Sequence, residues 1–186
     1  MDYLMELWPP ILLSAVFVFV ASSVLHMVLP IHKGDYKKLA GEDALTSALR
    51  GQVAPGDYMF PWSGSMKEMS SPEMVKKLEQ GPVGNMTIIP SGPFNMGRNL
   101  LQWFLYCVLI GTFVAYTGMF ALPPGSEYGR VFQVTGAAAV LGYAFASIPN
   151  SIWKGVSWST TGRFVVDGVL YALVTAGTFG WLWPAA

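Results

Sequence analysis

Two ionisable residues, His26 and Asp167, interrupt long apolar stretches of this sequence. Charge is costly to bury in lipid, so an ionisable residue in such a stretch is a candidate for function. Arg163 lies four residues before Asp167, a spacing at which two side chains can pair along one helix face. We therefore expect an ionised Asp167 that is held by Arg163. We favour this structural role, and the alternatives are a proton or ion relay through Asp167 and His26, or a ligand site.

Other polar side chains are expected at the same depth as these two residues. Gln102 lies one turn inside the second apolar stretch, and Ser147 and Asn150 lie at the end of the third. The predicted intramembrane polar cluster therefore consists of His26, Gln102, Ser147, Asn150, Arg163 and Asp167.

The residues that could hold a metal or cofactor are few. His26 and His32 are the two histidines of the chain, and Pro30 separates them, so they cannot be the axial ligands of one haem from different spans. Methionines are frequent between residues 59 and 96 and could bind copper(I), but no His or Cys lies between residues 33 and 95. We interpret these methionines as flexible apolar packing. We predict no bound metal and no cofactor.

The sequence contains no signature of the common soluble enzymes. It has no Gly-rich phosphate loop, no G-x-S-x-G, no H-E-x-x-H and no CxxC motif. Asp167 is the only acidic residue in the apolar stretches, so they hold no pair of carboxylates for acid–base chemistry. We therefore predict no catalytic residue.

Four apolar stretches must position the polar cluster, at residues 8–30, 96–122, 128–149 and 161–183. Each is long enough to cross a membrane, which takes about 20 residues. Charged residues make up 12% of the chain, against about 25% in ordinary soluble domains. The pattern predicts an all-α polytopic membrane protein, a four-helix transmembrane bundle that forms a single membrane domain over residues 1–186. The formal net charge is zero, so we expect a lipid bilayer and not nucleic acid as its partner.

Lys and Arg residues concentrate between the first and second stretches, which predicts a cytoplasmic segment at residues 31–95 and termini on the opposite side. Asp2 and Glu6 precede the first stretch and no basic residue does, which favours a retained anchor over a cleaved signal peptide. Within the segment we expect short helices at residues 42–51 and from Ser70 to Gly81. Aromatic residues lie between them at Tyr58, Phe60 and Trp62. We favour packing of these rings on the protein or on lipid headgroups, and docking of a partner is the alternative.

Small residues recur every fourth position in the last two stretches, at Ala138, Gly142 and Ala146 and at Gly168, Ala172, Ala176 and Gly180. Such a pattern allows two helix backbones to approach closely. We expect the third and fourth spans to pack on each other, and the alternative is that one small-residue face contacts a partner subunit.

The final stretch at residues 167–184, the Ile152-Trp153 pair and the Gly81-Pro82 pair together resemble a group of small four-span bacterial inner-membrane proteins. The resemblance implies a bacterial inner (plasma) membrane with both termini periplasmic or extracellular. It implies no activity, so it transfers no catalytic residue.

These observations lead to two functional hypotheses. The first is a non-catalytic accessory or scaffold subunit of a larger membrane complex, with a membrane-protein partner or a second copy of the chain. The alternative is a small oligomeric transporter or an ion- or proton-conducting protein that uses Asp167 and His26.

Overall fold

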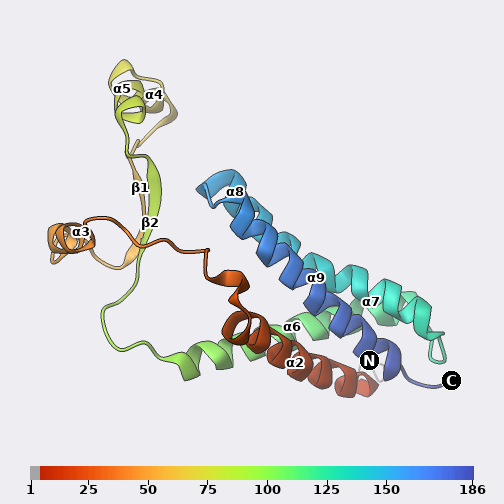
Figure 1. Ribbon diagram of the computed structural model, residues 1–186. Coiled ribbons are helices and arrows are strands. Elements are labelled where there is room, and N and C mark those ends of the chain that lie inside the picture. Colours follow the sequence, from red (N-terminus) through yellow and green to blue (C-terminus); the bar gives the residue numbers. More distant parts are fainter. Residues whose placement is uncertain (1–4) are drawn as a thin grey trace. The chain divides into compact units, whose positions relative to one another are not determined.

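The computed structural model describes residues 5–186 and is mostly helical (Figure 1). Asp2, which supported a retained anchor over a cleaved signal peptide, lies outside the described residues. Four helical segments are long and apolar enough to cross a membrane: Trp8–Val28, Met96–Ala121, Tyr128–Lys154 and Trp158–Trp181. The four predicted stretches are therefore confirmed as helices, and the architecture is that of a multi-pass membrane protein.

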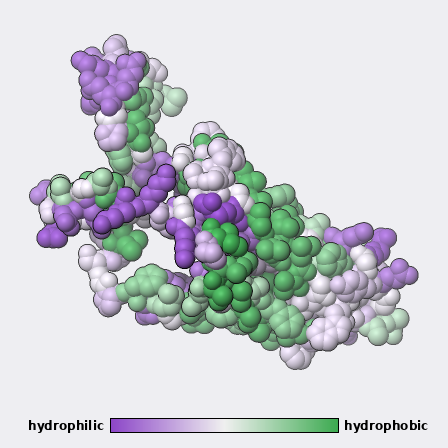
Figure 2. Space-filling view, viewed as in Figure 1, coloured by the Kyte–Doolittle hydropathy of each residue, from purple (hydrophilic) through white to green (hydrophobic). Residues whose placement is uncertain are grey.

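The chain divides into two compact units. One contains the residues up to 35 together with residues 95–151 and 156–186, and the other contains residues 36–94 and 152–155. The sequence led us to expect one membrane domain with a segment at residues 31–95, and the second unit is built mainly from that segment. Figure 2 shows hydrophobic residues over much of the helical unit and hydrophilic residues around the tip of the second unit.

The first helix of the helical unit changes its winding before it ends. Helix α2 (Trp8–Ser23) continues into the π-helical stretch η1 (Val24–Val28), where Leu29 N–H donates to Val24 O at 3.0 Å. Leu29 then adopts an extended conformation, because the ring of Pro30 excludes the helical region for the residue before it. The short 3-10 helix η2 (Pro30–His32) follows. This break turns the chain back beside the end of α2.

The remaining helices of this unit are α6 (Met96–Ala121), α7 (Tyr128–Tyr143), the 3-10 turn η3 (Phe145–Ser147), the first half of α8 (Ile148–Lys154) and α9 (Trp158–Trp181). Asn95 caps α6 by accepting from Arg98 N–H, and Ser157 caps α9 by accepting from Thr160 N–H. These caps satisfy backbone donors that have no partner within the helix. Trp103 on α6 donates its indole N–H to Ser22 Oγ on α2 at 2.8 Å, which fixes these two helices at the level of the polar cluster.

The small residues of α9 lie against α7 and η3. A Cβ on Gly168 would lie 2.5 Å from Ala144 Cα, and one on Gly180 would lie 2.7 Å from the Tyr128 ring. Ala172 and Ala176, which lie between these two glycines along α9, are also buried. On α7, Ala138 packs against the core, and a Cβ on Gly142 would meet Ile110 of α6 at 2.7 Å. Most of both small-residue faces is thus used inside the chain, while Ala146 lines a cavity described below.

The second unit contains strands as well as helices, which an all-α prediction did not include. Strand β1 (Gly56–Phe60) pairs antiparallel with β2 (Gly84–Ile88), so that Gly56 lies opposite Ile88. The helices are α3 (Glu42–Leu49), α4 (Met66–Met69) and α5 (Pro72–Gln80). Ser71 caps α5, because its hydroxyl accepts from Met74 N–H.

The three aromatic residues named above lie on or next to β1. Tyr58 donates its hydroxyl to Ala54 O at 2.8 Å, and the Phe60 ring covers Gly84 on the partner strand. Trp62 lies just beyond the strand and is 71% exposed. Phe60 therefore packs across the strand pair, and Trp62 is the most exposed of the three rings.

Candidate functional site

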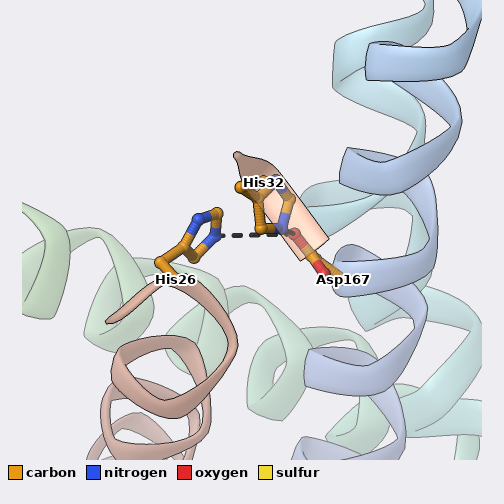
Figure 3. A group of neighbouring side chains, drawn as sticks. All are labelled: His26, His32 and Asp167. Atoms are coloured by element: carbon orange, nitrogen blue, oxygen red, sulfur yellow. Dashed lines mark ion pairs between the residues drawn. The ribbon is translucent and has the colours of Figure 1, made fainter. Parts of the chain in front are cut away.

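Asp167 lies in the first half of α9 and is only 3% exposed. Its carboxylate atom Oδ2 is 2.9 Å from His32 Nε2 and 3.5 Å from His26 Nε2. Figure 3 shows the three side chains pointing toward one another, His26 from the end of the first helix, His32 from the short segment that follows, and Asp167 from α9. A buried carboxylate is therefore in contact with both histidines of the chain.

The partner of Arg163 differs from the expected one. Among residues 5–186, the carboxylate that pairs with Arg163 is that of Asp35, whose Oδ1 accepts from Arg163 Nε at 2.7 Å. The predicted Arg163–Asp167 pair is wrong, because the turn after Pro30 brings a second carboxylate within reach of the guanidinium. Arg163 also donates to Thr160 Oγ1, one turn earlier on α9, at 3.3 Å.

Asp35 joins this ion pair to the histidines. Its Oδ2 lies 2.7 Å from His32 Nδ1, and this contact favours the tautomer that carries the ring proton on Nδ1 and leaves Nε2 without one. Burial alone would raise the pKa of Asp35, but the hydrogen bonds from His32 and Arg163 and the guanidinium charge together hold this pKa below its usual value. Asp35 is thus an ionised residue that orients the imidazole of His32.

The contact between His32 and Asp167 is close but is not a hydrogen bond. Although the two atoms are 2.9 Å apart, His32 Nε2 and Asp167 Oδ2 are both buried and have no hydrogen-bond partner among residues 5–186. The oxygen therefore lies off the direction in which a ring N–H would point. An unpaired buried carboxylate oxygen costs free energy, so this arrangement favours a further group that both atoms could bind.

The two imidazole rings are stacked, with their centroids 4.1 Å apart and their planes 25° from parallel. His26 belongs to η1 and His32 to η2, so the π-helical stretch and the break at Pro30 together bring about this stack. π-helical stretches are often found at functional sites, where they change the direction of a side chain.

An open cavity of about 930 Å³ lies beside the cluster within the helical unit. Its walls are mostly apolar, and the polar side chains on it include His26, Gln102, Ser147 and Asp167. The cavity thus collects four of the six residues predicted as a polar cluster. Of the other two, Arg163 is joined to the cluster through Asp35, and Asn150 lies on α8 and is not among the described residues that line the cavity.

Tyr171 adds a further polar group to the cavity wall, one turn after Asp167 on α9. Its side chain is buried, and its hydroxyl has no hydrogen-bond partner among the described residues 5–186. His26, in contrast, is 38% exposed at the side chain.

His32 and Asp35 belong to this cluster of contacts, although the sequence analysis did not include them in the predicted polar cluster. Their three-residue spacing, directly after a proline that ends a membrane helix, was the available signal. It predicts a local His–carboxylate contact, although it does not show that this contact lies beside Asp167.

The fold and the site together define a multi-pass helical protein with a histidine–carboxylate cluster at one end of its long helices. No protein-family model matches the chain, and no curated protein or solved structure matches it.

Proposed function

We propose that this chain is an ion-binding membrane protein that moves a cation across the bilayer as an oligomer. The observation that carries the proposal is that Asp167 contacts two histidines, whereas Arg163 is engaged by Asp35. A carboxylate held by arginine has a permanent partner, because the guanidinium stays protonated. A carboxylate that faces imidazoles has no permanent cation, because an imidazole, unlike a guanidinium, is not permanently charged.

The charges of the cluster support this proposal. Two carboxylates and one guanidinium are joined by the contacts described above, so one negative charge is not compensated when both imidazoles are neutral. Burying an uncompensated carboxylate away from water is costly. The site therefore gains stability when it takes up a cation, which is the property that ion binding requires.

The cavity supplies a route to the site. His26 and Asp167 both line it, and His26 is partly exposed, so an ion can reach the carboxylate without unfolding of the helices. Four spans offer few helices for a complete pathway, and we therefore propose that several copies assemble to form it.

We propose a bacterial inner membrane as the location, with residues 31–95 in the cytoplasm and both termini on the periplasmic side. The concentration of Lys and Arg in that segment supports this orientation. The cluster, at the end of the first span and the start of the last, would then lie near the cytoplasmic boundary. Single cysteines placed at positions 2, 76 and 185 of a Cys107→Ser background test the orientation. Labelling of position 76 by an impermeant reagent from outside intact cells would contradict it.

Flux measurements in proteoliposomes test the proposed function. Purified protein should carry protons or zinc ions faster than protein-free vesicles, and Asp167→Asn should abolish that flux while retaining the helical content. Asp43→Asn removes an exposed carboxylate on α3 and should leave the flux unchanged, so it is the matched control. A wild-type protein without flux of either ion, or an Asp167→Asn protein with full flux, would refute the proposal.

A second candidate is an accessory subunit of a larger membrane complex. The exposed ring of Trp62 favours it, because a large aromatic side chain is a common anchor at protein interfaces. Gentle purification from the native membrane, with identification of associated proteins, distinguishes the two functions. A partner that is lost from Trp62→Ala but kept by Asp167→Asn would favour the accessory role.

A further inference from the structure

We propose that His26, His32 and Asp167 form a binding site for a divalent transition-metal ion of the zinc class. This inference rests on the proposed function and names the ion that the same site takes. One ligand atom from each residue is available, and the three atoms lie within 4.8 Å of one another. The ligands come from three separate elements, η1, η2 and α9, so the metal would join the end of the first span to the last.

The distances from Asp167 to the two imidazoles suit a metal, once the stacked His26 and His32 rings turn so that both Nε2 lone pairs point at one ion. Zinc binds histidine nitrogen and carboxylate oxygen at about 2.0–2.2 Å in tetrahedral geometry, which places neighbouring ligand atoms roughly 3.3 Å apart. Asp167 Oδ2 lies 2.9 Å from His32 Nε2 and 3.5 Å from His26 Nε2, on either side of that spacing. An ion near these atoms could therefore bind with small side-chain movements.

The unpaired atoms favour a metal over a shared proton. A proton between His32 and Asp167 would form a hydrogen bond, but their geometry does not allow one even at 2.9 Å. A metal ion bonds along the lone pair of each ligand and lies off the line that joins the two ligand atoms. Both atoms are thus left without a partner among residues 5–186 in the way that two ligands of one ion would be.

Asp35 contacts the ring nitrogen of His32 that does not face the proposed ion. A metal-bound histidine usually donates its other ring N–H to a carboxylate, which fixes the tautomer and makes the ligand more basic. His32 Nδ1 lies 2.7 Å from Asp35 Oδ2, and Arg163 holds the other oxygen of the same carboxylate. The Asp35–Arg163 pair therefore has a positioning role, in which it orients His32 without touching the ion.

The choice of ion follows from the ligands. Two imidazoles and one carboxylate suit zinc and its neighbours in the first transition row, whereas calcium and magnesium prefer oxygen ligands alone. Because His26 and Asp167 also line the cavity, the fourth position of a tetrahedral ion can face it and hold water or an exchangeable ligand. An open position of this kind allows the ion to be released, as transport requires.

Metal binding to the purified full-length chain tests the inference. The protein should carry an affinity tag without histidine, since the chain itself has only two histidines, and it should be stripped with a chelator. We expect one zinc ion per chain by equilibrium dialysis and elemental analysis. Cobalt(II) used as a probe should show the visible absorption of a tetrahedral site.

The variants separate ligands from supporting residues. Removing a supporting carboxylate behind a metal ligand typically weakens affinity 10–100-fold, so Asp35→Asn should lose about that much and keep the cobalt spectrum. His26→Ala, His32→Ala and Asp167→Asn remove ligands and should each weaken zinc binding by more than about 100-fold. Asp43→Asn, which removes an exposed carboxylate on α3, is the control that should bind zinc normally.

A measurement on the wild-type protein covers the case in which a ligand variant does not fold. With ¹⁵N-labelled histidine the chain contains two imidazoles, and zinc should shift the Nε2 resonance of both. Absence of stoichiometric zinc binding, unchanged resonances, or equal affinity in the folded ligand variants would overturn the inference. Proton flux without zinc binding would refute the metal site and leave the proposed function intact. Zinc binding without any flux would support the metal site and refute the proposed function.

Discussion

Gly168 sets the distance between α9 and the end of α7 beside Asp167, so one added methyl group there should force the two elements apart. A Cβ at this position would lie 2.5 Å from Ala144 Cα and 2.6 Å from Ala144 N. Carbon atoms in contact are about 3.5–4.0 Å apart, so Gly168→Ala requires a shift of roughly 1 Å. The obstructing atoms belong to the backbone and cannot rotate away.

The size of the effect follows from two opposing contributions. Overpacking typically costs about 1–3 kcal/mol, and the backbone contact places this substitution at the upper end. Alanine in a helix recovers about 1 kcal/mol relative to glycine. We therefore expect Gly168→Ala to lower the free energy of unfolding by about 2 kcal/mol.

Gly162 is the matched control because it lies on the same helix, and a Cβ there would meet no atom of residues 5–186 within 4 Å. Gly162→Ala should raise stability by up to about 1 kcal/mol, which leaves the two variants about 3 kcal/mol apart. Unfolding in mixed micelles by titration with sodium dodecyl sulfate, followed by circular dichroism, measures the difference. Equal stability of the two variants would show that α7 and α9 do not approach as closely as Gly168 indicates.

Three further predictions concern stability. The folded pKa of Asp35 is depressed, so its contribution to the free energy of unfolding should be complete above about pH 4 and be lost as the pH falls through the folded pKa. The free energy of unfolding of Asp35→Asn should therefore depend less on pH in acid than that of the wild type. Ser22→Ala leaves the Trp103 indole N–H without its acceptor and should lower the free energy of unfolding by about 1 kcal/mol or more. Ser23→Ala removes only a hydrogen bond within α2 and should have a smaller effect. Tryptophan fluorescence during unfolding compares the stabilities of the two variants. Ala176 is fully buried against α7, so Ala176→Leu should lower the melting temperature or change the oligomer size. An unchanged melting temperature together with an unchanged oligomer size would contradict this contact.

The long helices and much of their packing could be predicted from the sequence because both depend on local patterns. Apolar runs of more than about 20 residues indicate spans whatever the surrounding fold. Small residues at every fourth position lie on one helix face, so Gly168, Ala172, Ala176 and Gly180 had to act together. Their contact with α7 follows from the short connection between the third and fourth spans.

The site could be predicted only in part, because it depends on a break in helical periodicity. Spacing rules assume one regular helix, whereas η1 is π-helical and Leu29 is extended before Pro30. Only this path places His32 on the ring of His26. No count of residues along the chain predicts that stack, since six residues of regular helix would put the two side chains on different faces.

The partner of Arg163 shows how one such break changes the functional interpretation. If the nearest carboxylate in the sequence had captured the guanidinium, Asp167 would be neutralised and the site would have no need of a further ion. The turn after Pro30 instead supplies Asp35, which takes the permanent cation and also orients His32. Asp167 then faces the two histidines and not the guanidinium, beside an open cavity. We propose that an exchangeable cation is the partner of this arrangement, and its binding can be measured directly.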